Sequence, residues 1–180
     1  HFVYTSVYGA SSSSPVPFVA AKGHTEEALR ESGMAWTILS PNAFMDSWPG
    51  AIVGAPAVAG RPIVLVGEAR RRHSFVAEHD VAAFAVAAVL NPAARNRQLA
   101  IGGPEAVSWR DVVACYERAL GRTLDVRYVA PGEHVEGLPD LILGLLALQE
   151  TYDSEIDARA IAAEFGVTQT PLDAWVRASL

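Results

Sequence analysis

Residues 2–22 read FVYTSVYGASSSSPVPFVAAK, and this stretch decides the fold. Phe2, Val3 and Tyr4 are strong strand formers without a polar interruption, which is typical of a strand buried in a parallel sheet. A loop of one glycine, four serines and two prolines follows. A helix is predicted to begin at Phe18, and it places Lys22 one turn later. The stretch therefore predicts a strand, a loop and a helix of an α/β fold.

Two hydroxyl residues, Thr5 and Ser6, stand where the chain leaves this strand. Open α/β sheets bind ligands at the carboxyl ends of their strands, and the next helix brings Lys22 back over that end. The residues alone also allow a plainer interpretation, in which the hydroxyls cap a turn and Lys22 is an ordinary surface lysine. Both interpretations are open at this point.

The composition is that of a globular chain of 180 residues, enough for one domain with a substantial core. Hydrophobic residues make up 51% and charged residues 19%, which excludes a disordered chain. A net charge of −6 argues against nucleic acid as the main partner. The single cysteine, Cys115, indicates a reducing compartment, so a cytoplasmic location is expected. No membrane partner is expected, because no apolar run has the length of a membrane span.

A second strand is expected at residues 35–39, after a helix over residues 18–32 that Gly33 ends. Short links make this unit a right-handed crossover between parallel strands. The strand runs into Pro41 and Asn42. Proline fixes φ and the amide offers donors and acceptors, although this dipeptide is also an ordinary turn.

Three features together resemble the atypical short-chain dehydrogenase/reductase superfamily, and most of all its NmrA-like branch of NAD(P)-binding proteins. They are Thr5-Ser6 at the strand end, Lys22 in the next helix, and the segment WTILSPNAFM at residues 36–45. The resemblance covers the whole chain, but only the second half of the family's chain. The superfamily's active site joins a Ser or Thr at the end of this strand to a Tyr-x-x-x-Lys on this helix. Here the frame reads FVAAK, so the lysine matches, whereas Phe18 replaces the tyrosine that donates a proton.

The resemblance implies a site at the carboxyl ends of these strands, with NADP or NAD as cofactor and a small-molecule substrate. It implies catalytic roles for Lys22, Thr5 and Ser6. Cofactor contacts are implied for Lys22, Pro41, Asn42 and Ala43. The implied substrate pocket is lined by Tyr8, Phe18, Phe44, Met45 and Trp48, of which the last three also suit the core. No metal site is expected, because His24 and His79 lack partners at ligand spacing.

The rest of the chain is expected to complete an α/β fold. Residues 1–103 would form the C-terminal half of a Rossmann-type parallel sheet, with a small inserted strand pair near residues 61–77. Residues 104–180 would form a small α/β substrate lobe. The turn of the strand pair carries Arg70–Arg72, which suits an anionic ligand or, more simply, a solvated turn.

Local signals set several helix ends in this part of the chain. Asp80 is predicted to cap a helix over residues 81–90. Ser108 and Asp111 are predicted to form a capping box, and Gly121 is predicted to end that helix. Parallel strands are expected around Val3, Ile38 and Leu99.

The function expected from the resemblance is that of an NAD(P)-dependent oxidoreductase acting on a small organic, carbonyl or quinone-like, substrate. Because Phe18 has no proton to give, an NAD(P)-sensing regulator without turnover is the alternative, and a fragment without the cofactor-binding half is another. The chain opens at His1 inside a strand and contains no Gly-rich dinucleotide motif. The family's first half is therefore expected upstream, where it would complete the cofactor site. Without it, the open edge of the first strand favours a homo-oligomer.

Overall fold

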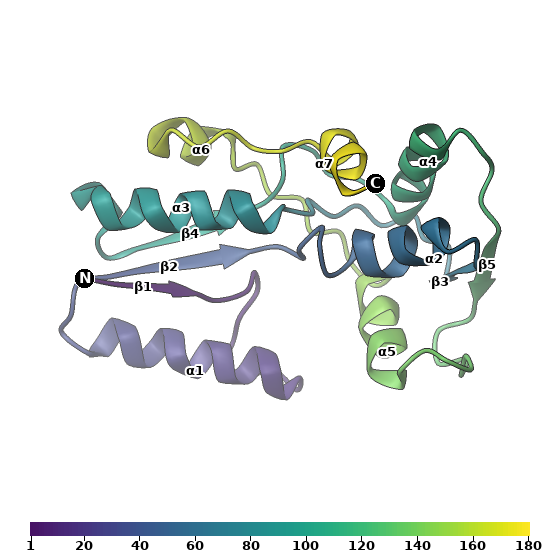
Figure 1. Cartoon of the computed structure of the whole chain (residues 1–180). Helices are drawn as coiled ribbons and strands as arrows, with labels where there is room; N and C mark the ends of the chain where they lie inside the picture. Colours follow the sequence, from purple (N-terminus) through teal and green to yellow (C-terminus); the bar gives the residue numbers. More distant parts are fainter.

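The computed structural model describes all 180 residues, and a three-stranded parallel sheet lies at one end of it (Figure 1). Strands β1 (Phe2–Thr5), β2 (Trp36–Pro41) and β4 (Arg97–Ile101) lie in the order β1-β2-β4, so β1 is an edge strand. The parallel arrangement predicted for the strands around Val3, Ile38 and Leu99 is confirmed.

Helices cover both faces of this sheet (Figure 1). Helix α1 (Pro17–Glu31) lies on one face, and α3 (Glu78–Leu90) and α6 (Arg159–Phe165) lie on the other. Leu39 of β2 joins a cluster of 10 buried residues with Phe84 of α3 and other apolar side chains of that face. Because β2 has a strand on each side and helices on both faces, it is buried along almost its whole length.

The larger core lies in a lobe beyond the carboxyl ends of these strands (Figure 1). A connected cluster of 22 buried residues fills the lobe, so most of the apolar burial that stabilises the chain is there. The lobe contains the π-helix η1 (Pro49–Gly54), α2 (Ala55–Val58), β3 (Ile63–Val66), α4 (Trp109–Leu120), β5 (Val126–Val129), α5 (Asp140–Gln149) and α7 (Leu172–Ser179). A 3-10 helix, η2 (Pro92–Ala94), precedes β4. None of the helices combines the length and the apolarity that crossing a membrane requires.

The inserted strand pair predicted near residues 61–77 is wrong, because β3 takes its partner from elsewhere. It pairs in parallel with β5, and the segment around His73 and Val76 makes only isolated bridges. The Glu150 carboxylate accepts the backbone N–H groups of Glu68 and Ala69 and holds the turn after β3. The chain therefore leaves β3 at this turn, and β5 returns to its side after α4. The lobe core draws on residues before and after position 103, so the division into 1–103 and 104–180 stays a prediction.

The structure confirms the helix ends predicted for α4 and contradicts the one predicted for α3. Ser108 and Asp111 form the predicted capping box of α4, which ends at Gly121 in the left-handed conformation, with φ at 65°. The predicted cap by Asp80 is wrong, because α3 begins at Glu78 and Asp80 lies inside its first turn. The buried Asp80 carboxylate instead accepts the backbone N–H and the hydroxyl of Thr170, at 2.7 and 2.9 Å. A long-range partner has therefore taken the place of the local cap.

Candidate functional site

Lys22 reaches back from α1 to the end of β1, as the strand–loop–helix stretch predicts. Its Nζ donates a hydrogen bond to the backbone carbonyl oxygen of Thr5 at 2.8 Å. The same nitrogen lies 4.9 Å from the ring centroid of Tyr4 and 5.7 Å from that of Phe18. An ammonium near two aromatic rings gains a modest cation–π attraction. Lys22, Thr5 and Phe18 are thus brought together.

Lys22 is also the only lysine of the chain, beside 13 arginines. It takes part in none of the ion pairs of the structure. An ammonium group has three donors, and one is used on Thr5, so two remain for a ligand. A single lysine in an arginine-rich chain is a feature of the sequence that singles out this position independently of the motif.

Thr5 and Ser6 do not share one environment, although they are neighbours. Successive side chains of a strand point to opposite faces. Ser6 is 2% exposed, and its hydroxyl donates to the carboxylate of Glu26 on α1 at 2.5 Å. Thr5 is exposed. The Ser6 hydroxyl is therefore already bound, whereas Thr5 is an exposed residue whose hydroxyl has no hydrogen-bond partner in this chain.

The segment after β2 is held in place by its own hydrogen bonds. Asn42 donates through Nδ2 to the carbonyl oxygen and to Oγ of Ser154, at 2.8 and 3.0 Å. Its Oδ1 accepts the backbone N–H of Ala43 at 2.8 Å. Pro41 is buried, and its carbonyl oxygen accepts the N–H of Tyr8. The Asn42 amide thus fixes the backbone here, and cofactor contacts by residues 41–43 stay a prediction.

The five residues predicted to line a substrate pocket fall into two groups. Tyr8 and Phe18 are 47% and 61% exposed, and the Phe18 ring lies 5.7 Å from the Lys22 nitrogen. Met45 is fully buried in the lobe core, and Phe44 and Trp48 are half-buried against the two cores. The five main hollows of the surface, of about 310 to 640 Å³, are lined by other residues. Lys22 lines none of these five hollows, and the pocket role of its site stays a prediction.

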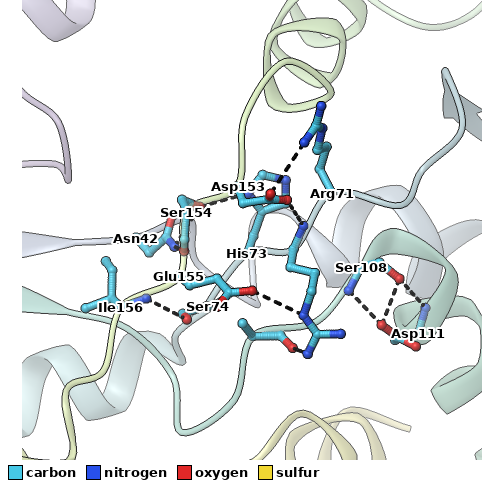
Figure 2. Close-up of polar contacts among 12 residues, drawn as sticks. Asn42, Arg71, His73, Ser74, Ser108, Asp111, Asp153, Ser154, Glu155 and Ile156 are labelled. Atoms are coloured by element: carbon cyan, nitrogen blue, oxygen red, sulfur yellow. Dashed lines mark hydrogen bonds and ion pairs between the residues drawn. The ribbon is translucent and has the colours of Figure 1, made fainter.

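Sequence reasoning missed a polar junction between the sheet and the lobe, which Figure 2 shows. His73 is 1% exposed, and its Nδ1 lies 2.8 Å from Oγ of Ser154, the residue that also binds Asn42. Burial lowers the pKa of His73, against a smaller opposing effect of Asp153. The junction joins segments more than a hundred residues apart, so it has no local sequence signal.

The three arginines of the turn all have acidic partners. Arg70 lies beside Glu68, at 3.4 Å. Arg71 pairs with Asp153 at 3.4 Å (Figure 2). Arg72 pairs with Glu155 at 3.3 Å. These exposed pairs contribute little to stability, but they offset the positive charge of the turn. The arrangement favours the solvated charged turn over an anion site.

Comparisons with known proteins agree on one family. The family model described as the NmrA-like family matches residues 1–174. The NAD(P)H azoreductase of Xenophilus azovorans is 34% identical over 130 residues, which are 72% of this chain and 44% of that protein. The (4-alkanoyl-5-oxo-2,5-dihydrofuran-3-yl)methyl phosphate reductase of Streptomyces griseus is 34% identical over 128 residues, which are 69% of this chain and 43% of that one. The matched part of this chain thus spans less than half the length of these relatives.

Solved structures share the fold at lower identity. An NADPH-dependent quinone oxidoreductase from Escherichia coli superposes with a TM-score of 0.77 at 21% identity, covering 97% of this chain and 66% of the other. The Citrobacter triphenylmethane reductase, solved with NADP(H), gives a TM-score of 0.78 at 18% identity, covering 99% and 64%. The expected Rossmann-type α/β fold is confirmed by these matches.

Proposed function

The chain belongs to the NmrA-like family, and on this premise we propose that the intact protein is an NAD(P)H-dependent reductase of small organic molecules. The contact between Lys22 and the carbonyl of Thr5 is the observation that carries the proposal. It brings a lone ammonium group to the carboxyl end of a parallel strand, where α/β sheets bind ligands. The similarity to an NAD(P)H azoreductase supports the same class of reaction.

The chemistry of Lys22 fits a nicotinamide dinucleotide. Such a cofactor supplies a hydride when it is bound. The two free donors of the Lys22 ammonium suit the hydroxyl pair of a ribose, and its charge would polarise a nearby carbonyl or water. The exposed hydroxyl of Thr5 would orient the substrate. Residues 41–43 would close the site beside β2, and NAD and NADP both suit this part of it.

The reaction also needs a proton, and Phe18 cannot donate one. The side chains near this strand end that can do so include the Lys22 ammonium, directly or through a water, and the phenol of Tyr4, whose ring centroid lies 4.9 Å from the Lys22 nitrogen. They also include the phenol of Tyr8, which is 47% exposed. The exposed rings of Tyr8 and Phe18 would stack on a flat conjugated substrate. A quinone-like or carbonyl substrate is therefore the class we propose.

Lys22→Met is the test of this function. The change keeps the length and helix propensity of the side chain but removes its charge. In the full-length gene product, the dissociation constant for NADPH should rise about tenfold, the effect of losing one charged hydrogen bond. Reduction of a naphthoquinone or an azo dye should be lost. Fluorescence titration and NADPH oxidation measure the two effects.

Arg95→Met is the matched control, because the Arg95 side chain is exposed and makes no hydrogen bond or ion pair. It should leave both measurements unchanged. Equal NADPH affinity in wild type and Lys22→Met would show that the site is assigned wrongly.

The second candidate function is NAD(P) sensing without turnover, and Phe18 in the tyrosine position is the observation that favours it. A sensor would bind NADPH through Lys22 and reduce none of a panel of quinones, azo dyes and carbonyl compounds. A reductase would oxidise NADPH with at least one of them.

A further inference from the structure

Glu26 is a charged side chain buried between α1 and the sheet. It is 3% exposed and accepts hydrogen bonds on both carboxylate oxygens. Oε1 accepts from the hydroxyl of Ser6 at 2.5 Å, and Oε2 accepts from Arg30 at 2.8 Å. Nε2 of Gln98 lies 3.3 and 3.2 Å from the two oxygens. The carboxylate is thus bound from the end of β1, from β4 and from its own helix.

The partners of Glu26 are joined to one another as well. Gln98 also donates to the hydroxyl of Ser40 at the end of β2, at 2.8 Å, and accepts from Arg30 at 2.7 Å. The network therefore spans all three strands of the sheet. Every residue in it lies on the α1 face, since Ser6, Ser40 and Gln98 alternate with the residues that pack against α3.

Helix α1 has few other attachments to the sheet. Its buried residues are Gly23, Glu26 and Leu29, and no side chain caps its first turn. Gly23 touches the serine loop, because a Cβ there would lie 2.2 Å from the backbone nitrogen of Ser12. Of the buried residues, Glu26 alone makes hydrogen bonds from its side chain to the sheet. Lys22 and Arg30 also donate to the sheet, at Thr5 and Gln98, but neither side chain is buried. Glu26 is therefore the buried polar attachment of α1 to the sheet.

Glu26 is attached to both partners of the Lys22 contact. It follows Lys22 by one helical turn on the same side of α1. Its hydrogen-bond partner Ser6 is the chain neighbour of Thr5, whose carbonyl oxygen accepts from Lys22. A displaced Glu26 would therefore shift the helix and the strand end relative to each other.

We propose that Glu26 is the positioning residue of this site, which holds Lys22 at the Thr5 carbonyl through its hydrogen bond to Ser6. Its effect on cofactor binding rests on the function proposed above, whereas its effect on the position of Lys22 does not. A buried ion pair is often no more stabilising than apolar packing. An apolar residue at position 26 could pack equally well, but it could not accept the hydrogen bond of the Ser6 hydroxyl. This hydrogen bond is what the site requires of position 26.

The first test observes the position of Lys22 by NMR in protein labelled with ¹³C-lysine. The Lys22 signal is the one that disappears in Lys22→Met. The nearby rings of Tyr4 and Phe18 shift this signal from the position of a solvated lysine. Glu26→Met should move it toward that position, because methionine keeps the side-chain length but lacks the oxygen that accepts the Ser6 hydroxyl. Ser6→Ala should move it in the same direction. Glu31→Met is the matched control, because Glu31 lies on the same helix, is exposed and has no side-chain partner.

An unchanged Lys22 signal in Glu26→Met would overturn the proposal. If that variant does not fold, Ser6→Ala decides in the same way, because it removes the bond and keeps the pair of Glu26 with Arg30.

The second test is a double-mutant cycle on the dissociation constant for NADPH in the full-length protein. Glu26→Met should raise this constant about tenfold in the wild-type background and less than about twofold in the Lys22→Met background. A merely structural role would give the same factor in both backgrounds and would contradict positioning. If Lys22→Met itself leaves NADPH binding unchanged while Glu26→Met moves the Lys22 signal, the proposed function fails and the positioning role stands.

Discussion

Lys22 and Phe18 stand one turn apart on α1, and in the proposed function they together decide the chemistry of the site. Lys22 offers charge and donors, whereas Phe18 offers an apolar ring, 61% exposed, 5.7 Å from the Lys22 nitrogen. A tyrosine at position 18 would hold its hydroxyl near this charge, which would lower its pKa. The absent hydroxyl is therefore the main chemical difference from the motif of the superfamily.

Phe18→Tyr should create or raise carbonyl reductase activity in the full-length protein. General acid catalysis contributes on the order of 100-fold or more to such rates, so an increase of that order is expected. The rate should fall at alkaline pH, because only the neutral phenol donates a proton. Steady-state rates against pH measure both effects. Phe2→Tyr, an exposed change on β1, is the control, and equal rates in the two variants would contradict a role for position 18.

At the scale of elements, α1 depends on close contacts with the strand end and with the serine loop. The loop backbone lies directly against Gly23, where a Cβ would approach Ser12 N to 2.2 Å and the carbonyl carbon of Ser11 to 2.3 Å. The hydroxyl of Ser12 also donates to Glu27 at 2.5 Å. The loop thus returns onto the helix, and the small residue at position 23 allows this.

Gly23→Ala should destabilise the chain, although alanine favours helices. The added methyl group forces the loop away, and such overpacking lowers the free energy of unfolding by about 1–3 kcal/mol. Gly144→Ala in α5 is the matched control, because a Cβ there meets nothing within 4 Å. It should raise the free energy of unfolding by about 0.5–1 kcal/mol. Urea unfolding measures both values, and changes of the same sign would contradict the close packing at Gly23.

At the scale of the whole molecule, the sheet and the lobe meet at His73. Its backbone bonds to Val107, and its ring lies 5.7 Å from the ring of Phe75 in the lobe core. Its Nδ1 contacts Ser154, which binds Asn42 at the end of β2. Nε2 of His73 is buried without a hydrogen-bond partner. A charged imidazole is therefore unfavourable at this junction.

The chain should lose stability as the pH falls below the usual histidine pKa of 6.5. Burial lowers the folded-state pKa of His73, so between these two values the unfolded state binds more protons than the folded state. The free energy of unfolding should fall by up to about 1.4 kcal/mol per pH unit in this window. His73→Gln should reduce the slope of the free energy of unfolding against pH between neutral pH and the folded-state pKa. His134→Gln, a change at an exposed residue, should leave this slope as it is. Equal slopes in wild type and His73→Gln, measured by urea unfolding at several pH values, would contradict this role.

The sequence by itself determined the features that rest on neighbours in the chain. The run from Phe2 to Tyr4 predicts β1, Ser108 and Asp111 predict the start of α4, and the spacing from Thr5 to Lys22 predicts the contact at the strand end. These signals are local, because strand preference, capping and helix spacing act within a few residues.

Only the tertiary structure decided which distant groups meet. Ser6 forms a hydrogen bond with Glu26, and Asp80 forms one with Thr170 where a helix cap was predicted. Asn42 forms a hydrogen bond with Ser154, which is 112 residues away. Strand β3 pairs with β5 and not with the nearby segment. The physical reason is that buried polar groups must find hydrogen-bond partners wherever the fold brings them, and the local sequence does not specify which partners these are.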